Sequence, residues 1–194
     1  MEHSHKKTDM PHSAFVAPDF FIREATLADA AIIWQTIYDN RDYLRMWLPF
    51  VDALKDVADE EAFLKQLLAV PYADRSIVFV IGQGHELCGL VGFVTTDNVN
   101  HRTEIGYWLI PEYQGRGVMT RCVRHLCEWA VRERGMNSIR IRCAVGNAPS
   151  NAIPRRLGFT LEGVERAGEL LVNGRYTDLN VYSILKDEVE AWER

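Results

Sequence analysis

The sequence lacks a long apolar run, a Cys-x-x-Cys pair and an excess of positive charge. Because crossing a bilayer takes roughly 18 to 20 consecutive apolar residues, we expect no membrane-spanning helix. The formal net charge of −5 argues against nonspecific binding to nucleic acid or to anionic membranes. The first residues are rich in His and Lys and lack the apolar core of a signal peptide. We therefore expect a cytoplasmic protein that does not bind nucleic acid directly.

Cysteine is scarce, and the four cysteines include no Cys-x-x-Cys pair. They fall within segments that the pattern assigns to strands or to the main helix. We predict buried, reduced thiols without a metal or disulfide role for Cys88, Cys122, Cys127 and Cys143.

The first 19 residues contain three histidines, two lysines and two prolines with little apolar periodicity. This composition favours a flexible N-terminal tail. The remaining residues, 20–194, suit a single domain large enough to bury a core.

Hydrophobic periodicity predicts the order strand, two helices, three strands, helix, strand, helix, two strands. Thr26 and Asp29 form a capping-box pattern at the start of the first helix, and Gly135 is a candidate C-cap for the third helix. Asn173-Gly174 between the last two strands is a strong hairpin signal. The strands are expected at 20–25, 76–81, 87–95, 102–110, 138–145, 159–171 and 175–185.

Two glycines, Gly115 and Gly117, lie between a strand that ends near Ile110 and an apolar helix that begins at Val118. Backbone N–H groups in a first helical turn have no helical acceptor, and they bind phosphate oxygens where no Cβ blocks the approach. The segment is neither a P-loop nor a Rossmann fingerprint. It predicts an anion cradle suited to a pyrophosphate.

The cradle sequence, Gln-Gly-Arg-Gly-Val-Met at 114–119, resembles the coenzyme A loop of the GNAT family of N-acetyltransferases. Its usual form is Gln/Arg-x-x-Gly-x-Gly/Ala, and Met119 departs at the last position. A second hallmark of that family is an Asn-x-x-Ser turn followed by a short helix and Gly-Phe, which matches 147–159. Residues 159–182 are similar to the RimJ/RimL group, which acetylates the N-termini of ribosomal proteins. The resemblance covers about 20–186.

The resemblance implies the GNAT fold, an α/β architecture with a mixed, mostly antiparallel sheet of about seven strands. Helices are expected on both faces, and the fourth and fifth strands should splay apart to admit the coenzyme. The implied partners are acetyl-CoA and an amine acceptor, which is either a protein N-terminus or a small amine. A homodimer is also suggested by the resemblance alone.

Coenzyme contacts follow by matching the family's motifs to this chain. The Leu109 or Ile110 N–H should polarise the thioester carbonyl, as an oxyanion hole does. Asn147 should orient the pantetheine arm or a water molecule. The full set implied for coenzyme binding is Leu109, Ile110, Gln114, Gly115, Arg116, Gly117, Val118, Met119, Thr120, Asn147 and Asn151.

Catalysis requires a neutral amine, a proton acceptor and a donor for the leaving thiolate. An α-amine is roughly 10% neutral at pH 7, whereas a lysine is neutral to roughly 0.04%, so an N-terminus needs less help. Glu169 matches the base proposed for the RimJ/RimL group, and Glu104 is the alternative because other GNAT branches take the base from that strand. Ser150 matches the proposed acid, although it could instead cap the short helix.

Two alternatives to N-terminal acetylation remain open. One is acetylation of a small amine such as an antibiotic, a polyamine or an amino acid. The aromatic segment 43–50 could line either substrate's entrance, and Asp39, Asp42 and Asp52 nearby would suit a polycation. The other is a noncatalytic acyl-CoA-binding module, since a fold does not fix a function.

Overall fold

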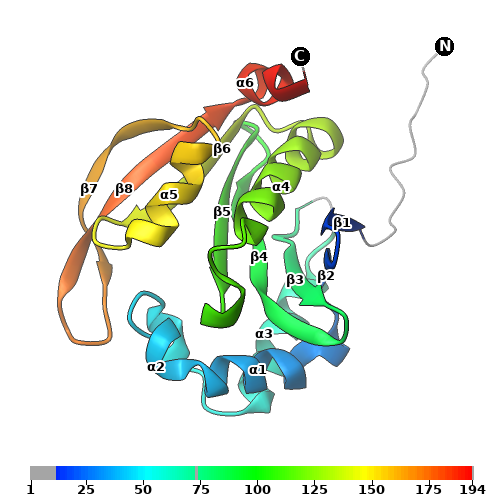
Figure 1. Ribbon diagram of the computed structural model, residues 1–194, viewed down its shortest axis with the longest axis vertical. Coiled ribbons are helices and arrows are strands. Elements are labelled where there is room, and N and C mark those ends of the chain that lie inside the picture. Colours follow the sequence, from blue (N-terminus) through cyan, green and yellow to red (C-terminus); the bar gives the residue numbers. More distant parts are fainter. Residues whose placement is uncertain (1–11, 73, 194) are drawn as a thin grey trace.

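An eight-stranded sheet forms the centre of the computed structural model, which describes residues 12–72 and 74–193 (Figure 1). Its strand order is β1-β2-β3-β4-β5-β6-β8-β7, and all neighbours run antiparallel except β5 and β6. The mixed, mostly antiparallel sheet expected from the sequence is confirmed. The strands are β1 (Ser13–Ala17), β2 (Phe20–Glu24), β3 (Val78–Gln83), β4 (Glu86–Asp97), β5 (Arg102–Leu109), β6 (Ser138–Ala144), β7 (Thr160–Leu170) and β8 (Tyr176–Leu185).

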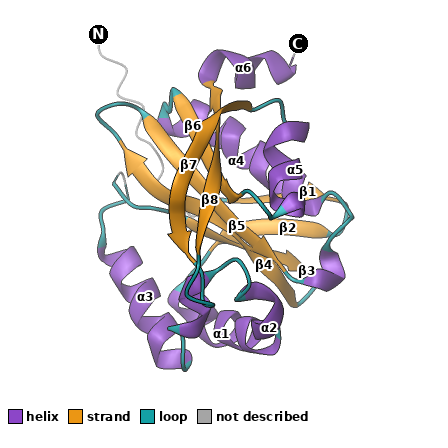
Figure 2. Cartoon of the chain, turned by 90° about the vertical axis from the view of Figure 1, so that its left-hand side faces the viewer, coloured by secondary structure: helices purple, strands orange, loops and turns teal. Residues whose placement is uncertain are grey.

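Helices cover the sheet on both faces. Figure 2 shows α1 to α3 grouped at one end of the sheet, with α6 at the other. Helices α1 and α4 both pack against β4, where the consecutive residues Val91, Gly92 and Phe93 are all buried, so both faces of this strand are covered. The helices are α1 (Ala30–Asp39), α2 (Arg41–Leu44), α3 (Val57–Ala69), α4 (Val118–Arg134), α5 (Ala148–Arg156) and α6 (Lys186–Glu190).

The structure confirms several local features that were predicted from the sequence. The Thr26–Asp29 capping box forms, and Gly135 ends α4 in the left-handed conformation. The four cysteines are buried and free, as predicted. None of the helices in the described part of the chain has the length and apolar character needed to span a bilayer.

Strand β1 lies within the segment predicted to be a flexible tail, so that prediction is wrong for residues 13–17. The strand pairs with the edge of β2, and half-buried Ala14 and Val16 alternate with exposed Ser13 and Phe15. This alternation is too short to stand out in the sequence. Just before the strand, the His12 ring stacks on His125 of α4, with 5.1 Å between centroids. Residues 1–11 of the predicted tail lie outside the described residues.

Strands β5 and β6 pair over only three positions. Arg102–Glu104 of β5 faces Ser138–Arg140 of β6 in the parallel register. Beyond these residues β5 continues against β4, and β6 continues against β8. The predicted splaying of the fourth and fifth expected strands, which are β5 and β6, is therefore confirmed.

Glu60 of α3 provides a stability test, because the residue is 4% exposed and burial raises the pKa of its carboxyl group to about 7. The folded state then binds more protons than the unfolded state between the ordinary glutamate pKa, near 4.5, and 7. Stability contributed by the protonated group is complete below pH 4.5 and is lost as pH rises through 7. We expect the free energy of unfolding of Glu60→Gln minus that of wild type, measured in urea, to increase by roughly 1 to 3 kcal/mol between pH 4.5 and 8.

The matched control is Glu61→Gln on the same helix. The Glu61 side chain is 43% exposed and pairs with Lys65 at the surface, so its stability difference should be small and flat with pH. Equal pH dependence in the two variants would contradict a buried proton on Glu60.

Candidate functional site

A cavity of about 810 Å³ opens where β5 and β6 diverge. Its walls come from the end of β5, the loop and first turn of α4, the start of α5 and the segment around α2. Nine of the residues singled out from the sequence line it: Leu109, Gln114, Gly115, Gly117, Val118, Met119, Thr120, Asn147 and Ser150. Ile110, Arg116, Asn151, Glu104 and Glu169 do not.

The loop before α4 has the geometry of an anion cradle. Gly115 and Gly117 have φ of 73° and 72°, the left-handed region in which glycine is favoured over other residues. Gly117 is the N-cap of α4, and because it has no side chain it leaves the N–H groups of the following turn without a side-chain cap of its own. The Met119 side chain is buried in the core, while its N–H remains part of that turn. An anion approaching this helix end meets N–H donors and the positive end of the dipole.

Two arginines add positive charge to this end of the cavity. Arg121 and Arg156 both line it, and neither forms an ion pair with a carboxylate of the described residues. Arg156 donates from Nη1 to Thr120 Oγ1 at 3.2 Å, which links the end of α5 to the start of α4. Arg116, in contrast, lies over the Tyr113 ring, 5.3 Å from its centroid.

The open edge of β5 supplies a further N–H donor. Residues of an antiparallel strand alternate between those that bond to one neighbour and those that face the other side. The Ile110 N–H donates to the Cys88 carbonyl on β4 at 2.9 Å, so Tyr107 and Leu109 direct their N–H groups toward the side where β6 has diverged. The Leu109 carbonyl accepts from Gln114 Nε2 at 2.8 Å. Two N–H groups were predicted to polarise the thioester carbonyl. That of Leu109 points toward the gap between β5 and β6, whereas that of Ile110 is already bonded to the Cys88 carbonyl.

Ser150 lies at the start of α5, on the cavity wall. The helix cap is Asn147, whose Oδ1 accepts from the Ser150 N–H at 3.3 Å, so the alternative that Ser150 is the cap is wrong. The Ser150 hydroxyl donates to Cys143 Sγ at 3.2 Å, and the Tyr107 hydroxyl donates to the Ser150 carbonyl at 3.0 Å.

Asn151 is 2% exposed and does not line the cavity. Its amide nitrogen donates to the Ala144 and Asn147 carbonyls, and its oxygen accepts from Asn180 and Tyr182. The bonds to Ala144, Asn180 and Tyr182 fasten α5 to β6 and β8. The structure therefore gives Asn151 a role in holding the site together, where the resemblance implied coenzyme contact.

The two candidate carboxylates differ in their surroundings. Both oxygens of Glu104 accept from Arg142 Nε, at 3.0 and 3.1 Å, and Arg142 also pairs with Glu165. Glu169 is half-buried on β7, close to the hairpin turn, and forms no ion pair within the described chain. The guanidinium of Arg142 therefore occupies both oxygens of Glu104, whereas Glu169 has no ion-pair partner in the described chain.

Aromatic side chains form another part of the cavity wall, next to the cradle loop. Tyr43 and Trp47 line it, and the Tyr43 hydroxyl accepts from Gln114 Nε2 at 2.7 Å. Trp47 packs so closely on Gly146 that a Cβ there would lie 3.2 Å from the indole. Part of the segment 43–50, which was expected to line a substrate entrance, lines this cavity, although its individual lining residues could not be told from core aromatics in the sequence.

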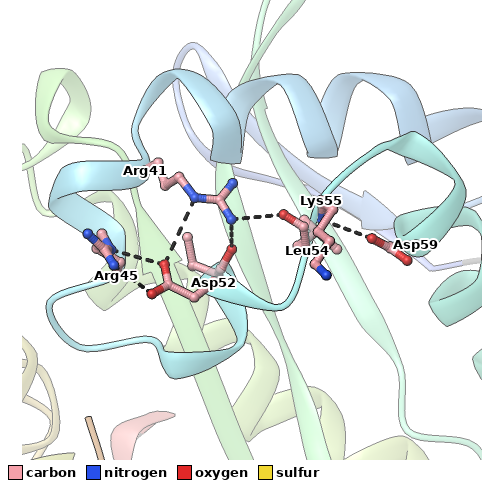
Figure 3. A network of polar contacts seen from close by, with 7 residues as sticks. Arg41, Arg45, Asp52, Leu54, Lys55 and Asp59 are labelled. Carbon is pink, nitrogen blue, oxygen red and sulfur yellow. Dashed lines mark hydrogen bonds and ion pairs between the residues drawn. The ribbon is translucent and has the colours of Figure 1, made fainter. Parts of the chain in front are cut away.

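Arginine side chains fix the backbone of this wall (Figure 3). Arg41 donates to the Val51 carbonyl and, at 2.9 Å, to the Leu54 carbonyl. Asp52 accepts from Arg45 at 2.6 Å, and this contact lowers the pKa of the Asp52 carboxyl group. Neighbouring arginines therefore compensate the negative charge of Asp52. This weakens the interpretation of the segment as a site for a polycation.

Tyr107 and Arg156 are among the lining residues that were not singled out from the sequence. Tyr107 belongs to a strand whose apolar run hides a hydroxyl group that faces the gap. Arg156 looks like an ordinary basic residue at a helix end, and only the fold brings it to Thr120. Among the described residues, no three metal-ligating side chains lie close enough together to hold an ion.

Comparison with known proteins places this geometry in a family. Residues 19–160 match the model of the acetyltransferase (GNAT) domain. The chain is 36% identical over 164 residues to the putative ribosomal N-acetyltransferase YdaF of Bacillus subtilis, covering 84% of this chain and 89% of that protein. It is 28% identical over 155 residues to the ribosomal-protein-serine acetyltransferase of Escherichia coli, covering 80% and 86%.

A solved structure agrees with the sequence relatives. The chain is similar to RimL, a ribosomal L7/L12 alpha-N-protein acetyltransferase in complex with coenzyme A, with a TM-score of 0.86 and 26% identity. The match covers 91% of this chain and 99% of that one. Three findings agree: the first turn of α4 begins at a glycine without a side-chain cap, β5 and β6 diverge, and the family model and the relatives match most of the chain. This protein belongs to the GNAT acetyltransferase family.

Proposed function

We propose that the protein transfers the acetyl group of acetyl-CoA to the α-amine of a protein N-terminus, with a ribosomal protein as the acceptor. The observation that carries the proposal is the cavity that joins the α4 cradle, the open edge of β5 and Ser150. The two relatives and the RimL structure support the acceptor class. The Escherichia coli relative and RimL are named as acetyltransferases of ribosomal proteins, and YdaF is named as a putative ribosomal N-acetyltransferase.

The coenzyme fits this cavity in one direction. Its pyrophosphate would meet the N–H groups at the start of α4, with Arg121 and Arg156 as neighbouring cations. The pantetheine arm would follow the edge of β5 that β6 leaves open. This order brings the thioester toward the Leu109 N–H, which would polarise its carbonyl, and toward the Ser150 hydroxyl.

The chemistry is direct transfer. The amine nitrogen attacks the thioester carbonyl carbon, the N–C bond forms, and the C–S bond breaks as the tetrahedral intermediate collapses. Glu169 accepts the amine proton, directly or through water, and the Ser150 hydroxyl supplies a proton to the departing thiolate and regains one from solvent. Glu104 is the weaker candidate for the base because Arg142 occupies both of its oxygens.

The α-amine is the acceptor that this site needs to help least, because roughly a tenth of it is already neutral at pH 7. A polycationic acceptor would call for unpaired carboxylates beside the cavity, and Asp52 is bound to Arg45. A noncatalytic binding module would not need a hydroxyl group held at the open edge of β5. The proposal also includes a cytoplasmic location, which rests on the sequence features described above, and a homodimer, which rests on resemblance alone.

Acceptor class and base can be tested together by following thiol release from acetyl-CoA. We expect turnover with Ser- and Ala-starting peptides and none with N-blocked lysine peptides or small amines. Glu169→Gln should lower kcat roughly 100-fold or more, because general-base catalysis contributes about that much. Glu104→Gln should cost less, since it removes an ion pair. Turnover on small amines alone would refute the acceptor class, and the reverse order of the two variants would move the base to Glu104.

The phosphate end can be tested with a substrate that lacks phosphates. Arg156→Gln should raise the KM for acetyl-CoA roughly 10- to 100-fold, the size of a lost charged hydrogen bond. With acetyl-pantetheine, the same variant should match wild type. The control is Arg124→Gln, because Arg124 lies on α4 but pairs with Glu128 outside the cavity. An equal effect on both substrates would contradict a phosphate contact.

A further inference from the structure

The carbonyl of Ser150 lacks its normal helical partner. In an α-helix the carbonyl of residue i accepts from the N–H of residue i+4. For Ser150 that residue is Pro154, which lies inside α5 and has no N–H. Proline at this position therefore leaves an acceptor at the cavity wall that must be satisfied from outside the helix.

Tyr107 supplies the missing donor. Its hydroxyl group donates to the Ser150 carbonyl at 3.0 Å. Tyr107 lies on β5 three residues beyond Glu104, the last residue that pairs with β6. The side chain therefore reaches from the open strand edge to the first turn of α5, and it spans the gap at the point where the two strands have separated.

With this bond, each polar group of Ser150 has a neighbour. Asn147 accepts from its N–H, Tyr107 donates to its carbonyl, and its hydroxyl donates to Cys143 Sγ at 3.2 Å, with the Tyr107 oxygen at 3.4 Å. Burial raises the pKa of both Tyr107 and Cys143, so both keep their protons at neutral pH. The Ser150 hydroxyl is thus surrounded by neutral groups that can each donate a hydrogen bond as well as accept one.

We propose that Tyr107 is a positioning residue for Ser150, that it acts through the carbonyl freed by Pro154, and that Cys143 is the group that releases the Ser150 hydroxyl to the leaving thiolate. The inference rests on the proposed function, in which Ser150 serves that thiolate. It assigns roles to three residues that the family motif does not include.

The exchange of hydrogen bonds follows from acceptor strength. Before reaction, Ser150 donates to the neutral sulfur of Cys143. A thiolate is charged and is therefore the stronger acceptor, so the Ser150 hydroxyl turns to it as the C–S bond breaks. The Cys143 S–H can then donate to Ser150 Oγ, which keeps that oxygen satisfied. Tyr107 holds the backbone of Ser150 in place during the exchange and loses no proton.

The test removes one hydroxyl group and then restores the hydrogen bond from another atom. Tyr107→Phe should lower kcat with acetyl-CoA roughly 10-fold, the effect of about 1.4 kcal/mol on the barrier, and change KM less than about twofold. Adding Pro154→Ala gives α5 an N–H at residue 154 that can donate to the Ser150 carbonyl, so the double variant should recover most of the lost kcat. Tyr72→Phe is the matched control, because its hydroxyl bonds to Glu24 away from the cavity, and its kcat should match wild type.

A second readout separates positioning from general structural damage. An acetyl thioester of a more acidic thiol needs less help with its leaving group, so Tyr107→Phe and Cys143→Ala should lose less activity with it than with acetyl-CoA. Cys143→Ser keeps a donor at that position and should exceed Cys143→Ala with acetyl-CoA. Coenzyme affinity and thermal unfolding, measured on every variant, show which ones remain folded.

Different results would contradict the role of Tyr107, the role of Cys143 and the proposed function. Unchanged kcat in Tyr107→Phe, or a double variant no better than Tyr107→Phe alone, would overturn the positioning role. If Tyr107→Phe did not fold, Cys143→Ala with the two thioesters would decide, and equal losses with both would overturn the proposal. Failure of the proposed function would appear in the wild-type protein itself, as no thiol release with any acceptor.

Discussion

The parallel pairing of β5 with β6 stops after Glu104 and Arg140, and the candidate site depends on that break. A strand that loses its neighbour exposes backbone N–H and C=O groups, which normally invite another chain to pair. In this protein the exposed edge forms one wall of a cavity, between α4 and α5, where an extended ligand can take the place of the missing strand. The carbonyl of Leu109 on this edge is already bound by Gln114, while its N–H faces the gap.

Elements on either side of the break are held by bonds that do not use the open edge. Asn151 fastens α5 to β6 and β8, and Arg41 fixes the backbone that carries Tyr43 and Trp47. These bonds hold the cavity wall in place before a substrate binds, so the protein loses less conformational entropy on binding. Tyr107 crosses from the open strand to the first turn of α5, where Pro154 leaves a carbonyl free to accept its hydrogen bond.

Several boundaries of helices and strands could be predicted from the conformational preferences of single residues. Thr26 with Asp29, the glycines before α4 and Gly135 after it each mark an element boundary by their own conformational needs, and each was predicted. Contacts between distant segments were not readable, because Arg156 reaches Thr120 and Arg142 reaches Glu104 only once the sheet has formed. Strand β1 was missed for a different reason, because the alternation of its five residues is too short to stand out. The cap role was left open for Ser150 because Asn147, three residues earlier, is also a residue type that caps helices.

Amide hydrogen exchange at Tyr107 and Leu109, with and without coenzyme A, tests most directly whether the coenzyme fills the gap between β5 and β6. These two N–H groups face the open side of β5, so coenzyme binding should slow their exchange, while the Ile110 N–H, already bound to Cys88, should change little. Unchanged exchange at Tyr107 and Leu109 under saturating coenzyme A would show that the ligand binds elsewhere and that the break in the sheet is not the coenzyme site.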